Sequence, residues 1–168
     1  MINHFVIDVE ANGPIIGKHS MIQIGIVNVH DTSINFYGEL KPLSNEFDQG
    51  AMTAIGLEHK DTLAYPSAPD TMKKLNTWLD GFDFRPIMWS DNPGFDWGWL
   101  NWYMWTYLGN NRLGWSCRRI GDLDSGMTGN LRSHRWRKYK VTKHTHNALD
   151  DAMGNAEALK VLFQKLIL

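Results

Sequence analysis

Apolar runs divide the first third of the chain into three predicted strands. They are rich in isoleucine, valine and phenylalanine, the residue types that favour strands. The predicted strands are His4–Glu10, Met21–Val29 and Ile34–Leu40. Short connections rich in glycine, asparagine, aspartate and serine separate them, as expected for neighbouring antiparallel strands.

The rest of the chain shows mainly the periodicity of amphipathic helices. The predicted helices are Gln49–His59, Pro69–Leu79 after the N-cap Ser67, Gly94 to about Leu108, and about Ala148 to Leu166. Short strands are predicted between them at Arg85–Ser90 and near Arg118–Leu123. This order predicts an α/β protein, one domain over residues 1–168, whose mixed sheet is antiparallel in its first three strands and then parallel.

Composition changes this picture little. The chain has 168 residues and a net charge of −1, so any nucleic-acid surface has to be local. The single cysteine, Cys117, cannot form an internal disulfide, which favours a reducing compartment. The sequence shows no signal-peptide pattern and no membrane span. We therefore expect a cytoplasmic protein without membrane contact, and its oligomeric state stays open, a homo-oligomer included.

Two carboxylates interrupt the first predicted strand. Asp8 and Glu10 alternate with apolar residues in FVIDVEANGP, so both face one side of the sheet at the carboxyl end of the strand. Like charges this close raise each other's pKa unless a cation lies between them, and oxygen ligands favour Mg²⁺ or Mn²⁺. The alternative is an edge strand whose two acids point to solvent.

A second acidic motif lies at the start of a predicted helix. In SDNPGFD, residues 90–96, Asn92 is a candidate N-cap and Pro93 takes the first helical position. Asp96 then lies about one turn inside, near the positive end of the helix dipole. Taken alone, Asp96 is better explained as a helix-start aspartate that favours the dipole. Asp91 is assigned to the turn.

The third motif is HTHNALDD, residues 144–151. His146 is a candidate proton acceptor because its ordinary pKa suits chemistry near neutrality. Asp150 is four residues from His146, on the same face if both are helical. If Asn147 caps the helix, however, Asp150 becomes its capping-box partner and Asp151 is free for other work. The spacing alone leaves both acids open.

Together the three motifs resemble those of the DEDDh family of 3′-5′ exonucleases, which includes proofreading subunits, oligoribonuclease and RNase T. The matching segments, in family order, are Asp8-Val9-Glu10, Asn92 to Asp96, and His146 to Asp151. The third match selects Asp151 over Asp150, and Ala11 stands where threonine is usual. The resemblance spans nearly the whole chain, is greatest to small bacterial and phage exonucleases, and implies a ribonuclease-H-like fold.

The resemblance also implies a mechanism. Two divalent ions, Mg²⁺ or Mn²⁺, are expected on the ligands Asp8, Glu10, Asp96 and Asp151. The expected catalytic residues are His146, which accepts a proton from the attacking water, and Glu10. Nucleoside 5′-monophosphates are expected to leave the 3′ end of single-stranded DNA or RNA. The residues expected beside the terminal nucleotide are Asn12, Gly13, Asn92 and Phe95.

Basic and aromatic residues gather in two further segments. Nine of the seventeen lysine and arginine residues lie between Arg112 and Lys143. In that segment Trp136 and Tyr139 alternate with basic residues, which suits phosphates and stacked bases. We predict phosphate contacts from Arg135, Arg137 and Lys138, against the alternative of a solvated loop. Four tryptophans crowd the Gly94–Leu108 helix, and core packing is expected for most of them.

Three rival interpretations accompany the exonuclease hypothesis. A catalytically inactive nucleic-acid-binding relative would lack a ligand or the histidine, and none is missing. The second rival is another Mg²⁺-dependent enzyme of the same fold, a phosphodiesterase, phosphatase or endonuclease. Among these, a ribonuclease H would not need the His146–Asp151 pairing, which this chain has. A zinc site on His144 and His146 is poorly supplied, because Cys117 is the only cysteine.

Overall fold

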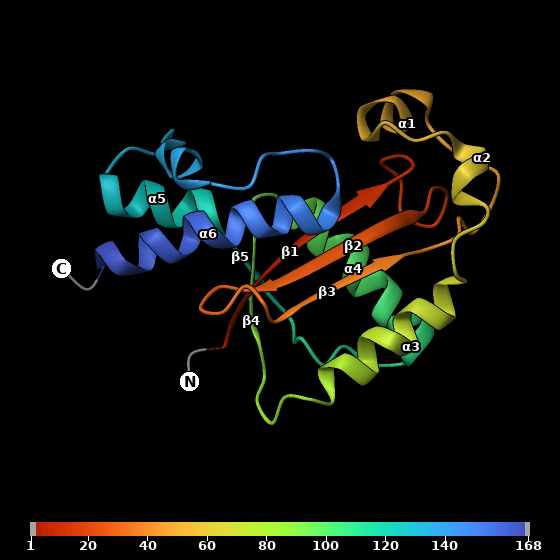
Figure 1. Cartoon of the computed structure of the whole chain (residues 1–168), viewed down its shortest axis with the longest axis horizontal. Helices are drawn as coiled ribbons and strands as arrows, with labels where there is room; N and C mark the ends of the chain where they lie inside the picture. Colours follow the sequence, from red (N-terminus) through yellow and green to blue (C-terminus); the bar gives the residue numbers. More distant parts are fainter. Residues whose placement is uncertain (1–2, 167–168) are drawn as a thin grey trace.

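The computed structural model describes residues 3–166. Its centre is a five-stranded sheet in the order β3-β2-β1-β4-β5 (Figure 1). The strands are β1 (His4–Ala11), β2 (Met21–Asn28), β3 (Asn35–Glu39), β4 (Ile87–Ser90) and β5 (Cys117–Arg119). β1, β2 and β3 pair antiparallel, whereas β4 joins β1, and β5 joins β4, in parallel. The predicted mixed sheet is confirmed.

The alternation of side chains along β1 separates two apolar cores. Phe5, Ile7 and Val9 belong to a core shared with α3 (Ala68–Leu79) and α4 (Pro93–Leu108). Val6 belongs to a second core, built mainly with α6 (Ala148–Leu166), which lies alongside β1 and β2 (Figure 1). Because Asp8 and Glu10 continue the alternation of Val6, they lie on the α6 side of the sheet.

Several helix boundaries follow from the local sequence. The Ser67 hydroxyl caps α3 by accepting a hydrogen bond from the Asp70 amide at 3.3 Å, as predicted. α4 begins at Pro93 with Asn92 before it, although the Asn92 side chain makes no capping bond. α6 covers the predicted range, Ala148–Leu166. Local signals therefore place the helices that carry two of the three acidic motifs.

The predicted helix over Gln49–His59 is wrong in part. The structure has two helices there, α1 (Gln49–Ile55) and α2 (His59–Thr62). Gly56 has a φ of 75°, a left-handed conformation that ends α1 because the helix cannot continue through it.

The predicted strand near Arg118–Leu123 is also wrong in part. β5 ends at Arg119 and α5 (Ile120–Thr128) begins at once. The basic segment after α5, predicted as a loop, contains the short 3₁₀ helix η1 (Arg135–Tyr139). The buried Asp124 carboxylate organises this segment, because it accepts hydrogen bonds from the Ser133 hydroxyl at 2.6 Å and the Trp136 amide at 3.4 Å.

Core packing is confirmed for two of the tryptophans near the second motif. Trp99 on α4 is fully buried and Trp89 on β4 is nearly so. Trp97 and Trp102 are partly buried against the first core, whereas Trp105 is 42% exposed. Although α4 is rich in apolar residues, no helix within residues 3–166 is long and apolar enough to cross a membrane.

Candidate active site

The site begins where β1 and β4 separate. The two strands pair only from His4 and Ile87 to Val6 and Trp89, and α4 starts beyond the end of β4. The Val9 amide of β1 donates instead to the Asp96 carboxylate at 3.2 Å, and the Ser90 hydroxyl donates to its other oxygen. Asp96 is therefore held beside the carboxyl end of β1.

Two residues of β2 dock the start of α6 against the sheet. Gly25 lies directly opposite Asp8 in the β1–β2 pair. A Cβ atom at Gly25 would lie 2.2 Å from the carbonyl oxygen of Ala148, so only glycine permits this approach. The Gln23 side chain accepts a hydrogen bond from the Ala148 amide at 3.2 Å. Asp151, in the first turn of α6, is thereby brought to β1.

The segment before α6 surrounds the Asp151 carboxylate. The amides of Thr145 and His146 donate to its two oxygens, each at 3.1 Å, and His144 Nδ1 lies 2.8 Å from Oδ2. His146 has a φ of 57°, a left-handed conformation that is uncommon outside glycine and that recurs at functional sites. In this conformation His146 Nδ1 lies 3.9 Å from Glu10 Oε1.

Asn147 caps α6 as the sequence predicts. Its side-chain oxygen accepts from the Leu149 amide at 3.0 Å and from the Asp150 amide at 3.4 Å. The predicted reciprocal bond from Asp150 is wrong, because the Asp150 carboxylate accepts from the Thr145 hydroxyl at 2.8 Å. Asp151, and not Asp150, faces the other site acids.

Five carboxylates meet at this edge of the sheet, and we call them the carboxylate cluster: Asp8, Glu10, Asp91, Asp96 and Asp151. They form two groups of three that share Asp8. Within each group, one carboxylate oxygen per residue lies within 4.8 Å of the others. The first group contains Glu10 and Asp151, and the second contains Asp91 and Asp96.

Burial and mutual repulsion raise the pKa values of three members of the cluster, Asp8, Glu10 and Asp96. Asp8 is only 9% exposed, and burial, followed by the charges of Asp96 and Glu10, raises its pKa well above the ordinary value. Burial and then the Asp151 charge raise the pKa of Glu10 to about 8. Burial raises the pKa of Asp96 to about 7, although the Ser90 hydrogen bond opposes it. At neutral pH these groups require protons or a cation.

The donor set fits a hard divalent cation. The hydrogen bonds of this edge go to Asp96 and Asp151, and within residues 3–166 no donor serves the buried Asp8 carboxylate. Oxygen ligands of this kind suit Mg²⁺ and Mn²⁺. His144 and His146 also form a group with Asp151 whose ligand atoms lie within 4.8 Å of one another.

The family follows from comparison with known proteins. The RNase T exonuclease family model matches residues 5–159. This range contains the whole carboxylate cluster together with His144 and His146. The chain belongs to the RNase T exonuclease family. It is a 3′-5′ exonuclease of the DEDDh type that acts on nucleic acids, and the resemblance predicted from its motifs is confirmed. Exonuclease domains of this family use divalent metals.

The exonuclease is 33% identical to the 3′-5′ DNA exonuclease Cap18 of Escherichia coli, over 93% of this chain and 89% of that protein. The nuclease domain of 3′hExo, a DEDDh family member bound to rAMP, shares the fold with a TM-score of 0.70 at 16% identity, over 96% of this chain and 92% of that one.

Two longer proteins share the fold as well. Cell-death related nuclease 4 has a TM-score of 0.76 at 12% identity, over 98% of this chain and 64% of that one. E. coli exonuclease I in complex with dT13 has a TM-score of 0.76 at 14% identity, over 99% of this chain and 44% of that one. The exonuclease thus spans less than two thirds of either, and the ribonuclease-H-like fold is what they share.

Asn12 and Gly13 shape the loop beyond Glu10. Asn12 is fully buried, its side-chain oxygen accepting from the Ser20 amide at 2.6 Å and its nitrogen donating to the Glu46 carbonyl at 3.2 Å. A Cβ atom at Gly13 would lie 2.5 Å from the His19 ring. Both residues thus have structural roles, and their approach to the terminal nucleotide stays a prediction.

Asn92 and Phe95 lie at the start of α4. Asn92 is exposed, and its carbonyl accepts from the amides of Phe95 and Asp96 at 2.9 and 3.0 Å. The Phe95 ring is partly buried and lies edge-on to Trp99, with centroids 6.2 Å apart. Both residues are within one turn of Asp96, and their contact with substrate stays a prediction.

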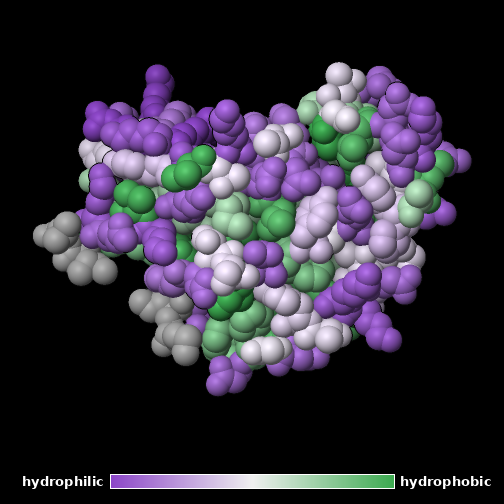
Figure 2. All heavy atoms as spheres, viewed as in Figure 1, coloured by the Kyte–Doolittle hydropathy of each residue, from purple (hydrophilic) through white to green (hydrophobic). Residues whose placement is uncertain are grey.

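Hydrophilic side chains gather over α5 and the segment after it (Figure 2). In this region Arg135, Arg137 and Lys138 are exposed on η1, where phosphate contact is sterically open. Trp136 between them is 1% exposed and belongs to the second core. The prediction that bases stack on Trp136 is therefore wrong, because a buried ring is closed to bases. The buried indole instead stabilises the segment that presents the basic side chains.

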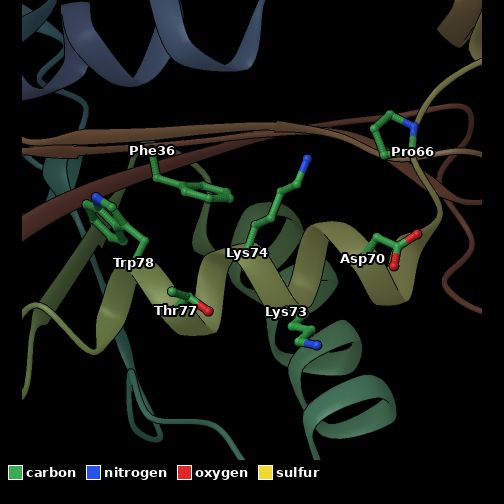
Figure 3. Close-up of a pocket in the computed structure, with 7 residues that line it drawn as sticks. All are labelled: Phe36, Pro66, Asp70, Lys73, Lys74, Thr77 and Trp78. Carbon is green, nitrogen blue, oxygen red and sulfur yellow. The ribbon is translucent and has the colours of Figure 1, made fainter.

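A surface depression of about 730 Å³ lies between β3 and α3, on the other face of the sheet (Figure 3). Phe36 extends from the sheet toward α3 and lies beside Trp78, with ring centroids 5.7 Å apart. Asp70 is the only acidic residue that lines the depression, and its carboxylate accepts a hydrogen bond from the Ser67 hydroxyl at 2.5 Å. The depression lacks the acidic chemistry of the carboxylate cluster.

The raised pKa values predict that the metal-free exonuclease loses stability as pH rises. Ordinary values are 4.5 for Glu10 and 3.8 for Asp96, whereas the folded pKa values are about 8 and about 7. At a pH between the ordinary and the folded pKa of each group, the folded chain keeps a proton that the unfolded chain releases. Raising the pH through this range therefore favours unfolding. In chelator, we expect the thermal midpoint to fall by about 5 °C or more from pH 6 to pH 8.5.

The matched variant is Glu10→Gln. Its thermal midpoint should fall less over the same pH range, because one of the two groups with a raised pKa is gone. Addition of Mn²⁺ should remove the fall in the wild type, since a cation favours the ionised carboxylates. An equal fall in wild type and variant, unaffected by Mn²⁺, would contradict this account of the cluster.

Proposed function

We propose that this exonuclease removes nucleoside 5′-monophosphates from the 3′ end of single-stranded DNA, with single-stranded RNA as the second candidate substrate. The observation that carries the proposal is the pair of three-carboxylate groups sharing Asp8. DNA is preferred because the relative at 33% identity is named a DNA exonuclease. The free thiol of Cys117 supports a cytoplasmic setting.

Two divalent ions, Mg²⁺ or Mn²⁺, are part of the proposal. Asp8, Glu10 and Asp151 would hold one ion, while Asp8 and Asp96 would contribute to the other. Such ions, when bound, stabilise the charge on both the attacking and the leaving oxygen of an in-line displacement. The protein's own part is to fix these carboxylates: hydrogen bonds orient Asp96 and Asp151, and strand pairing orients Asp8 and Glu10.

His146 acts as the general base in this proposal. Its side chain is 43% exposed and lies next to Glu10, so water reaches the ring beside the carboxylates that would hold the ions. The imidazole accepts a proton from the attacking water, whose oxygen bonds to phosphorus as the bond from phosphorus to the O3′ of the preceding nucleotide breaks. The released nucleotide keeps the phosphate at its 5′ position, and the O3′ of the shortened strand takes up a proton from solvent and becomes the new 3′-hydroxyl.

Hydrolysis in ¹⁸O-labelled water tests this chemistry. The proposal predicts that the label enters the phosphate of the released 5′-mononucleotide and is absent from the shortened strand. A phosphatase would release unlabelled strand and inorganic phosphate, and an endonuclease would release internal fragments. A labelled phosphate at the 3′ end of the strand would contradict the proposed direction of bond cleavage.

The basic side chains of η1 give a further prediction. Replacing Arg135, Arg137 and Lys138 together with glutamine should weaken binding of a single-stranded oligonucleotide. The slope of log affinity against log salt should flatten by about 2, because each phosphate contact on a single strand contributes about 0.7. Fluorescence anisotropy of a labelled oligonucleotide, without divalent ions and at several salt concentrations, measures the affinity and its salt slope.

The control replaces the exposed pair Lys73 and Lys74 on α3 with glutamine, which removes surface charge from the other face of the sheet. This variant should keep a slope close to that of the wild type. Equal slopes in the η1 variant and the wild type would count against a role of η1 in substrate binding.

A further inference from the structure

Asp91 is the one member of the carboxylate cluster outside the four-carboxylate set predicted from the family motifs. It follows β4 directly and precedes Asn92, where the second motif begins. The sequence analysis assigned it to the turn. In the structure its carboxylate oxygen lies within 4.8 Å of oxygens of both Asp8 and Asp96, so its assignment to the turn alone is incomplete.

The backbone on both sides of Asp91 is held in place. The Ser90 hydroxyl accepts from the Asn92 amide at 2.8 Å and donates to Asp96. Arg119 Nε donates to the Asp91 carbonyl at 3.3 Å. These bonds use the main chain of the turn and leave the Asp91 carboxylate to the cluster.

Within residues 3–166 no basic side chain neutralises this carboxylate. The guanidinium of Arg119, which reaches the Asp91 carbonyl, forms its ion pair with Asp122 at 2.9 Å. In the part of the chain that the structure describes, Asp91 has no ion-pair partner. Its neighbour Asp8 is nine-tenths buried and receives no hydrogen bond within that same part. Three carboxylates converge here, and among residues 3–166 only Asp96 receives hydrogen bonds from the protein. A divalent cation satisfies such an arrangement.

We propose that Asp91 is a metal ligand that, with Asp8 and Asp96, holds the second ion of the pair. This inference rests on the proposed two-ion function and extends it. With only Asp8 and Asp96 as protein ligands, the second ion would depend largely on substrate phosphate for its binding. A third carboxylate raises the ligand charge, which raises cation affinity. The second ion therefore binds this exonuclease before the nucleic acid arrives.

Titration with Mn²⁺ in the absence of nucleic acid, followed by electron paramagnetic resonance, tests this. Wild-type protein should bind two ions with comparable affinities. Asp91→Asn should bind one ion as the wild type does and the second at least about tenfold more weakly, a loss of about 1.4 kcal/mol. Asp91→Glu keeps the carboxylate and should restore part of the second affinity. Glu10→Gln should instead weaken the other ion.

Asp122→Asn is the matched control, because it removes a nearby aspartate that is exposed and paired with Arg119. It should bind both ions as the wild type does. In a second readout, the Mg²⁺ concentration for half-maximal cleavage should rise in Asp91→Asn while the rate at saturating Mg²⁺ recovers.

Three results would overturn the inference or its basis, and each is distinct. Two ions bound at wild-type affinity by Asp91→Asn would refute Asp91 as a ligand. Loss of both ions in Asp91→Asn and Asp91→Glu would also refute it, because Asp91 would then support the whole site. A single ion on the wild type, with chelator-sensitive cleavage intact, would refute the two-ion function itself.

Discussion

The Asp8→Asn variant is expected to lose 3′-end cleavage while keeping its fold. Asp8 is shared by both three-carboxylate groups, so its loss weakens the sites of both ions at once. Metal ions contribute several kcal/mol to such displacements, and the rate should therefore fall by about 10³ or more. The measurement is the initial rate on a 5′-labelled single strand at saturating Mg²⁺.

Stability separates this effect from misfolding. Repulsion from Asp96 and Glu10 contributes to the raised pKa of Asp8, so removing its charge should leave the metal-free thermal midpoint unchanged or higher. Asp150→Asn is the matched control, since Asp150 bonds to Thr145 and lies outside the cluster. It should retain nearly full activity. More than about a tenth of the wild-type rate in Asp8→Asn would contradict the shared-ligand role.

His146→Ala is expected to lower the rate by about 10² to 10⁴, the usual contribution of a general base, while binding of the single strand stays within about twofold. The rate at saturating substrate should also lose the limb of its pH profile that reports deprotonation of the imidazole. Because His146 has a φ of 57°, His146→Asn is the second variant. Asparagine tolerates the left-handed conformation, so equal losses in both variants exclude backbone strain as the cause.

The histidines offer one competing explanation, because His144, His146 and Asp151 form a group with metal-ligand spacing. If His146 is a ligand, excess Mn²⁺ should restore the rate of His146→Ala. If it is the base, excess Mn²⁺ should not. His144→Ala, whose ring contacts Asp151 at 2.8 Å, should lose less activity and keep the pH limb. Recovery by Mn²⁺ alone would refute the general-base role.

The three motifs were predictable from sequence because each lies in one element or its cap. The strand alternation aims Asp8 and Glu10 to one side, and the caps before α4 and α6 place Asp96 and Asp151 in first turns. These are local rules, and the structure brings the four carboxylates together. The order of strands and helices likewise predicted the mixed sheet.

What the sequence did not reveal depends on contacts between distant segments. Asp91 resembles any turn residue until β4 is paired beside β1. Gln23 and Gly25 are ordinary strand residues until Ala148 of α6 approaches them. Trp136 lies among basic residues, and only the packing of η1 on α6 shows that it belongs to the core. A signal was present in one case. Asp91 directly follows β4, a strand parallel to β1, and site residues of such sheets gather beyond the carboxyl ends of their strands.

The most direct test of the central claim uses 5′-labelled single-stranded DNA and RNA with Mg²⁺, with Mn²⁺, or with chelator. The account predicts a ladder of products that shorten stepwise from the 3′ end, faster on DNA than on RNA. Chelator should stop the reaction, and Asp8→Asn should show no ladder. An unchanged substrate under every metal condition, or products cut at internal positions, would contradict it.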